Sequence, residues 1–269
     1  MTSWEFSAAG PIEAEIRLPA GNVNLTATQT QTVTVSLLGQ RGGGSMSADK
    51  LIADTEVSFT GGRLTVEVPK RAQLRGDTSL DLTIGLPEGS SVTARTASAD
   101  VSSTGELGAL DVNTASGDVT ADWITGDASF TTASGDVRLT EAAGDVSVNT
   151  ASGDVTVQRI GGGLTAKTAS GDLRIGRAGR SAEVKTASGD VRIDSIAAGR
   201  ADVTTVSGDV ALAVPPGSGV YLDLSSLSGH VRSELDSDAS GGGDGDPDLT
   251  LRCSSVSGDI RITRAPAAG

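Results

Sequence analysis

Apolar and polar residues alternate with a period of two through the middle of the chain. One set of apolar pairs, each split by one polar residue, is Val137/Leu139, Val155/Val157, Leu173/Ile175 and Val191/Ile193. A second set lies between them, at Val146/Val148, Leu164/Ala166 and Ala182/Val184. Glycine-containing turn sequences such as Ser-Gly-Asp or Gly-Asp separate the pairs. The pattern predicts short, half-buried strands joined by tight turns, and it excludes helices from this region.

The turns repeat one motif, Thr-Ala-Ser-Gly-Asp-Val, at a fixed distance. Six copies or close variants place an aspartate every 18 residues, and two later copies add two more. We call these residues the aspartate ladder: Asp100, Asp118, Asp136, Asp154, Asp172, Asp190, Asp209 and Asp259. A fixed step of this size is the signature of a solenoid, in which each coil buries its apolar side against its neighbours. We therefore expect an all-β fold, a single parallel β-solenoid of 18-residue coils with a right-handed winding.

The strand pattern also predicts which side chains face inward. Each strand meets its copy one coil later in the same direction, so the coils should lie about 4.8 Å apart. The valines, leucines and isoleucines of the pairs should stack inward, and the residues two positions after each aspartate should stack outward. Alternation does not decide whether the alanine of Thr-Ala-Ser faces the core or the solvent. We expect it inside, because later copies have Val206, Leu227 and Val256 at that position.

The regularity of the repeat divides the chain into parts. The first part carries Trp4 and Phe6, which suit a cap over the open end of a solenoid, a segment of one or two helical turns near residues 47–54, and a hairpin around Gly61-Gly62. The predicted parts are a cap with irregular coils at 1–95, regular repeats at 96–210, degenerate coils at 211–262 with an acidic loop at 236–248, and a tail at 263–269.

Composition narrows the classes of partner. Aromatic residues make up 2% of the chain, which suits a narrow core of stacked aliphatic side chains. A net charge of −13 argues against nucleic acid and anionic membranes as partners, since both need basic patches. The one cysteine excludes an internal disulfide, and no apolar run approaches the 18 residues of a membrane span. The first residues lack the features of an export signal, so we expect a cytoplasmic location, with the cell surface as the alternative.

Several motifs together resemble a known family. They are the recurring Thr-x-Ser-Gly-Asp-Val, Leu-Pro-Ala-Gly-Asn-Val at 18–23, Leu-Pro-x-Gly-Ser-x-Val at 86–92 and Ser-Val-Ser-Gly-Asp-Ile-Arg-Ile at 255–262. The sequence resembles the bacterial putative-adhesin β-strand-repeat family, a domain of unknown function common in actinobacteria. This resemblance covers nearly the whole chain. It implies a parallel β-solenoid and no known catalytic residues.

Candidate catalytic groups are few. His230 is the only histidine and occupies the slot that holds aspartate in the full copies. A nucleophilic pair with Cys253 would need one repeat position to have become catalytic, and we expect instead a surface histidine and a buried thiol. Zinc ligands are not clustered, and the glycines lie in β-turns, where they do not form a phosphate-binding loop. We expect no cofactor.

Two stretches of the sequence resemble calcium-binding patterns, and each departs from its pattern. Asp244, Asp246 and Asp248 begin like an EF-hand loop, but Leu249 stands at the position of its glycine. A nine-residue echo inside each coil resembles the calcium-binding nonapeptide repeat, yet the aspartate directly precedes the apolar residue. For the aspartate ladder, the alternatives are bound calcium or hydrogen bonds within each turn, helped by arginines that reach aspartates in adjacent coils. We favour the second.

Three functions from different classes remain. The first is a non-enzymatic scaffold or binding module that presents its ridged surface to an unknown protein or glycan, as a monomer or by end-to-end association. The second is a calcium-dependent surface adhesin. The third is a solenoid carbohydrate-active enzyme, which the small number of aromatic residues disfavours.

Overall fold

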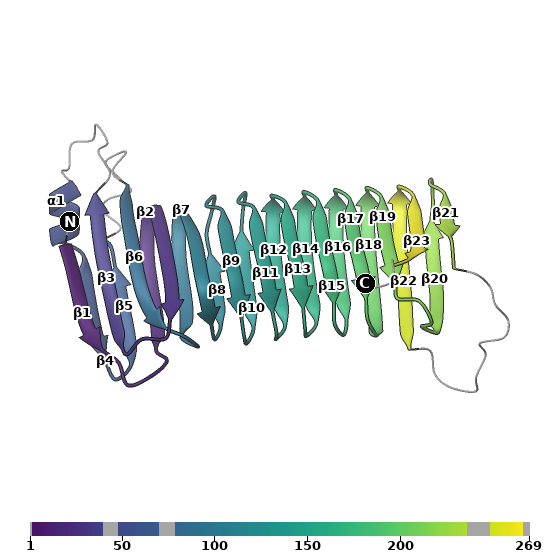
Figure 1. Cartoon of the computed structure of the whole chain (residues 1–269). Coiled ribbons are helices and arrows are strands. Elements are labelled where there is room, and N and C mark those ends of the chain that lie inside the picture. The colour runs from purple at the N-terminus through teal and green to yellow at the C-terminus, as the bar shows by residue number, and fades with distance from the viewer. Residues whose placement is uncertain (1, 40–47, 70–78, 236–247, 266–269) are drawn as a thin grey trace. The chain divides into compact units, whose positions relative to one another are not determined.

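The structure, a computed structural model, describes residues 2–39, 48–69, 79–235 and 248–265 (Figure 1). Within these ranges the chain forms 23 strands and one short helix, so the expected all-β class is confirmed. The strands form parallel solenoid coils in each of two compact units, Met1–Thr140 and Glu141–Gly269. No helix in the described ranges has the length and apolarity that a membrane crossing requires.

The first unit begins with less regular elements and continues into regular coils. Its elements are β1 (Thr2–Ser7), β2 (Glu13–Thr28), β3 (Thr32–Gly39), α1 (Ala48–Ala53), β4 (Glu56–Thr60), β5 (Arg63–Glu67), β6 (Leu80–Pro87), β7 (Ser91–Leu107), β8 (Leu110–Asn113), β9 (Val119–Ile124) and β10 (Ala128–Thr132). Strand β11 (Val137–Ala142) contains the boundary between the units.

Antiparallel strands lie at the start of the first unit. Strand β3 pairs antiparallel with both β1 and β6, and β4 forms the expected hairpin with β5 around Gly61-Gly62. The rings of Phe6 and Phe59 lie 5.4 Å apart between centroids. The short helix α1 confirms the expected helical turns. These pairings differ from the parallel ladders of the regular coils.

The long strand β2 organises the first unit. Its first half pairs in parallel with β5, its second half with β6, and nearly all of it with β7 on the other side. The strand turns a corner between its halves at Gly21, where φ is +121°. A Cβ there would lie 1.9 Å from the carbonyl oxygen of Leu80, so the corner requires glycine. From β7 onward the pairing advances by 18 residues, as Val101 opposite Val119 shows.

The second unit consists almost entirely of two-stranded coils. Its strands are β12 (Val146–Ser152), β13 (Val155–Ile160), β14 (Leu164–Ser170), β15 (Leu173–Ala178), β16 (Ala182–Ser188), β17 (Val191–Ile196), β18 (Gly199–Ser207), β19 (Val210–Val214), β20 (Val220–Ser226), β21 (Val231–Ser233), β22 (Leu249–Ser257) and β23 (Ile260–Arg264). Each strand from β12 to β17 pairs in parallel with the strand two places later (Figure 1). The register Val155 to Leu173 to Val191 confirms the 18-residue coil.

The last coils do not follow sequence order. Strands β22 and β23 lie between β18/β19 and β20/β21, with β22 paired to both β18 and β20 (Figure 1). The coil formed by β20 and β21, residues 220–235, is therefore the last in the stack of the second unit. We call it the end coil. The inserted coil buries Leu249, Leu251 and Cys253 almost completely.

The alanine of Thr-Ala-Ser lies outside, and the expectation that it faces inward is wrong. The threonine is buried instead, at Thr114, Thr132, Thr150, Thr168, Thr186 and Thr205. Alternation simply continues from the inward valine of the preceding strand. The buried hydroxyl can bond to its own turn, as when Thr186 Oγ1 donates to the Ser188 carbonyl at 3.2 Å. The larger residues at the alanine position are accordingly exposed, Val206 by 52% and Leu227 by 82%.

Candidate functional site

The first unit carries a charged groove where β5, β2 and β7 run side by side. Alternation buries Ala14 and Ile16 of β2 and turns Glu13, Glu15 and Arg17 outward. On β5, Arg63 stands opposite Glu13, and Glu67 stands opposite Arg17. On the other side, β7 places Ser91 beside Glu13, Thr93 beside Glu15 and Arg95 beside Arg17. We call this surface the β5–β2–β7 groove.

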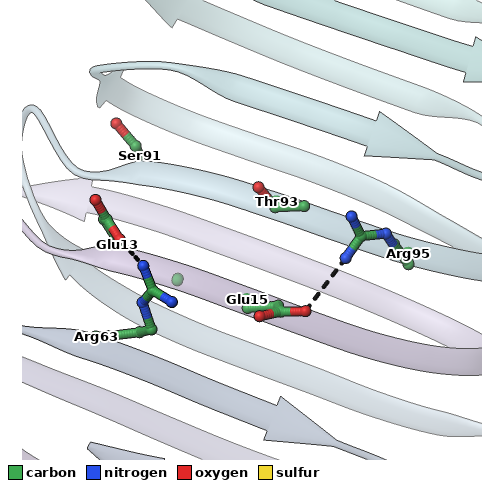
Figure 2. A pocket seen from close by; sticks show the side chains of 7 residues that line it. Glu13, Glu15, Arg63, Ser91, Thr93 and Arg95 are labelled. Carbon is green, nitrogen blue, oxygen red and sulfur yellow. Dashed lines mark hydrogen bonds and ion pairs between the residues drawn. The ribbon is translucent and has the colours of Figure 1, made fainter. Parts of the chain in front are cut away.

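Ion pairs link the three strands across the groove. Arg63 Nη2 donates to Glu13 Oε2 at 2.6 Å, and Arg95 Nη1 donates to Glu15 Oε1 at 3.2 Å (Figure 2). The same Glu15 oxygen accepts from Arg17 Nη2 at 2.8 Å, and Arg17 Nη1 lies 3.5 Å from Glu67 Oε1. The hydrogen bond to Glu15 and the negative charge of Glu67 raise the pKa of Arg17. Glu15, Arg17, Glu67 and Arg95 are thus connected, and the Arg63–Glu13 pair lies beside them on the same sheet.

Two adjoining hollows lie along this surface and share Arg95. The first, drawn in Figure 2, has a volume of about 380 Å³ and is lined mainly by Glu13, Glu15, Arg63, Ser91, Thr93 and Arg95. The second has a volume of about 370 Å³, and Leu18, Pro19 and Val68 make it more apolar. Both are open to water. They could hold an extended ligand that carries charges with an apolar group at one end.

The groove offers charged groups that can bind a ligand. The side chains of Arg63 and Arg95 are more than half exposed, so both guanidinium groups can donate further hydrogen bonds to a ligand. The lining residues include no histidine or cysteine. Within the described ranges no three His, Cys, Asp or Glu residues are grouped to hold a metal ion.

The aspartate ladder links coils through the backbone. In the first unit, the N–H of Asp118 donates to Asp100 Oδ1 and that of Asp136 donates to Asp118 Oδ1, both at 2.9 Å. In the second unit the same bond, at 2.8–3.0 Å, joins Asp172 to Asp154, Asp190 to Asp172, Asp209 to Asp190 and Asp259 to Asp209. The donor therefore belongs to the next coil, whereas we expected it in the same turn.

The arginines near the ladder also pair differently from expectation. Arg138 Nη2 bonds Asp136 Oδ2 and Arg174 Nη2 bonds Asp172 Oδ2, each at 2.8 Å. Both pairs lie within one coil, two residues apart, and Arg192 bonds Asp194 in the same way. The expected diagonal pairs between coils are wrong. Two residues on the same face of one strand are close enough for the short aspartate to meet the arginine, while its other oxygen is held by the next coil.

The remaining candidate residues are dispersed. Asp244 and Asp246 lie outside the described residues, and Asp248 Oδ2 accepts the N–H of Gly219 at 3.1 Å. His230 is exposed. Its backbone N–H donates a hydrogen bond to Asp259 Oδ1 at 2.8 Å, and this bond lowers the pKa of Asp259. Cys253 is buried, and burial raises its pKa to about 12. A buried protonated thiol and an exposed imidazole do not form a nucleophilic pair.

Sequence reasoning missed the β5–β2–β7 groove. Its signal in the sequence is local, the alternation of Glu13, Glu15 and Arg17 with apolar residues. That pattern indicates an outward face but not its neighbours. Arg63 and Arg95 lie 50 and 80 residues from their glutamate partners, so only the strand register brings them together.

Two known structures were found to be similar to this chain, and the first shares its fold. One, described as a putative lipid binding protein from Parabacteroides distasonis, is 11% identical over 96% of this chain and 96% of that chain, with a TM-score of 0.51. Another, described as a putative adhesin from Bacteroides fragilis, is 13% identical over 97% of this chain and 96% of that chain, with a TM-score of 0.41. A search of curated proteins gives no match.

Comparison with family models assigns the chain to a protein family. The model described as Toastrack DUF4097 matches residues 14–196 and 178–263, which together span most of the chain. The match includes the whole aspartate ladder and all of the β5–β2–β7 groove except Glu13. The expected actinobacterial distribution stays a prediction. The chain belongs to the Toastrack DUF4097 family.

Proposed function

We propose that this protein is a non-enzymatic binding scaffold, and that the β5–β2–β7 groove of its first unit holds an extended segment of a protein partner. The observation that carries the proposal is the set of ion pairs that Arg17, Arg63 and Arg95 form with three glutamates around two open hollows. Guanidinium and carboxylate groups fixed on a sheet recognise charges of both signs at set distances.

A peptide fits the groove better than a glycan. Sugar-binding and other small-molecule sites commonly place aromatic side chains in the lining, and neither hollow has one. A segment with an acidic and a basic residue could exchange the exposed Arg63–Glu13 pair for its own ion pairs. Its apolar residue would then lie near Leu18 and Val68. Because the charges are exposed, we expect weak affinity that falls with salt.

The other candidate functions have less support. Many carboxylates of the aspartate ladder already accept backbone N–H groups, which leaves less reason for calcium to offset their repulsion. A carbohydrate-active enzyme has less support because neither hollow has an aromatic side chain to hold a sugar ring. A cytoplasmic location remains part of this proposal, with the cell surface as its alternative. Cell fractionation with an antibody to the protein distinguishes the two.

The test is a binding screen with matched variants. Arrays of peptides with systematically varied charge, and an array of glycans, are probed with the wild-type protein, with Arg63→Ala/Arg95→Ala and with Arg174→Ala/Arg192→Ala as a control of equal charge. We expect peptide binding that is lost in the groove variant and kept in the control. Binding to glycans alone, or equal loss in both variants, would contradict the proposal.

A further inference from the structure

The end coil leaves two strand edges without a partner in the described part of the chain. Strand β20 pairs with β22 on one side, and β21 pairs with β23 on the corresponding side (Figure 1). No described strand of the second unit pairs with their other sides. An open edge presents a row of backbone N–H and C=O groups that can bond another strand.

The core is also open at this coil. Val220, Leu222 and Leu224 of β20 stand opposite Leu249, Leu251 and Cys253 of β22. The β22 residues are buried almost completely, whereas the β20 residues in the same columns are only partly buried. Val231 of β21, opposite the buried Ile260, is also 43% exposed. Core positions exposed in this way give an apolar surface that a partner can cover.

The sequence of β20 fits a second copy of itself. It reads Val-Tyr-Leu-Asp-Leu from Val220 to Leu224. In an antiparallel pair centred on Leu222, that residue meets its own copy and Val220 meets Leu224. All apolar side chains then share one face. On the other face Tyr221 stands opposite Asp223, so a phenol can donate to a carboxylate and the two Asp223 residues are not directly opposed.

The charge of the end coil permits the approach of a second copy. The whole chain carries −13, but residues 220–235 contain two acidic residues, Asp223 and Glu234, and one arginine, Arg232. Asp223 Oδ2 also lies 3.7 Å from Arg252 Nε of the neighbouring coil. Residues 220–235 thus carry about one net negative charge, so the repulsion between these two segments themselves is small at physiological salt.

We propose that the end coil is the contact surface of a symmetric dimer, in which β20 of one copy pairs antiparallel with β20 of a second copy about a twofold axis at Leu222. A twofold contact of this type uses the same patch on both copies, so it closes at two. It would satisfy the open backbone edge and cover Val220, Leu222 and Leu224 in one step.

Cysteine crosslinking tests both the dimer and its register. Opposed residues in an antiparallel pair have Cα atoms about 4.5–5.5 Å apart, within disulfide range. Leu222→Cys should therefore form a disulfide-linked dimer under mild oxidation. Leu224→Cys is the matched control, on the same face of the same strand, and should not link to its own copy. Both variants carry Cys253→Ala, because Leu224 stands opposite Cys253 on β22 and a cysteine at 224 could otherwise link to it within one copy.

Sedimentation and light scattering measure the association itself. The wild type should form a dimer that grows no further with concentration. Leu222→Lys should weaken it by roughly tenfold or more, because a charge would enter the contact. Leu38→Lys, at an exposed leucine of the first unit, should leave it unchanged. A wild type that is still monomeric at a concentration about 100 times above the low-micromolar range would overturn the proposal. Open-ended oligomers would also overturn it, as would equal crosslinking of Leu222→Cys and Leu224→Cys.

Discussion

Replacing Asp172 separates the two roles of a ladder carboxylate. Its Oδ1 accepts the N–H of Asp190 at 3.0 Å, and its Oδ2 pairs with Arg174 at 2.8 Å. Asp172→Asn keeps an acceptor oxygen and loses the charge, whereas Asp172→Ala loses both. The difference between the two variants therefore isolates the hydrogen bond that joins one coil to the next.

The charge effects nearly cancel in Asp172→Asn. Carboxylates about 4.8 Å apart repel by about 0.9 kcal/mol in water, and by roughly half of that at physiological salt. Removing the charge relieves repulsion from Asp154 and Asp190, about 1 kcal/mol in total, and loses an exposed ion pair worth under about 1 kcal/mol. Asp172→Asn should thus keep the free energy of unfolding within about 0.5 kcal/mol of the wild type.

Asp172→Ala should be less stable than Asp172→Asn. A backbone N–H that loses its acceptor at a partly exposed site costs about 1–1.5 kcal/mol, which corresponds to a fall in Tm of about 3–5 °C for a unit of this size. Thermal and urea unfolding, followed by circular dichroism with and without chelator, measure the difference in stability between the two variants. Equal stability of the two variants would refute the hydrogen-bond reasoning. A large calcium-dependent rise in Tm, abolished in Asp172→Asn, would instead assign the ladder to calcium.

Three further predictions test the coil, its turn and its interior. Deleting Arg174–Val191 removes one 18-residue coil and should preserve cooperative unfolding, whereas deleting Arg174–Ala182 exchanges the two sides of later coils and should not. Gly189→Ala should cost about 3 kcal/mol or more, because φ is +127° and a Cβ would lie 2.1 Å from the Gly171 carbonyl oxygen; Gly10→Ala, where the space is open, should be nearly neutral in the same unfolding assay. The Cys253 thiol, with its pKa raised to about 12, should stay protonated and unreactive toward thiol reagents at pH 8 until the protein unfolds; rapid labelling of the folded protein would contradict its burial.

Local periodicity accounts for what the sequence predicted well. The strand positions, the parallel pairing and the 18-residue coil all follow from apolar residues two apart and a turn motif that recurs at one step. These features depend on residues close in sequence and on stacking of identical neighbours. Each coil of a solenoid has the same local structure, so a correct prediction for one repeat applies to many coils.

The errors arose where the chain bends or where similar copies compete. At the Thr-Ala-Ser corner, we predicted an inward alanine position because later copies have the apolar residues Val206 and Leu227 there, although alternation did not require it. The structure follows alternation because the buried threonine can pack its methyl group and bond its hydroxyl to the turn. The insertion of β22 between β18 and β20 was not predictable, because all three strands carry similar repeats. The inserted copy has the fully buried residues, and β20 lies at the end of the stack.

The structure separates the residues that hold coils together from those free to bind. Buried aliphatic columns, turn glycines and the aspartate ladder all contact the next coil, so a change at one of them affects at least two coils. Outward residues in the middle of a strand, such as Glu15 and Thr93, meet the neighbouring strands only at the surface, so they can change without disturbing the core or the turns. A charged groove can therefore form on β5, β2 and β7 without altering the solenoid. Binding specificity within this fold should accordingly reside in the outward mid-strand positions, while the turn motif that identifies the family carries stability.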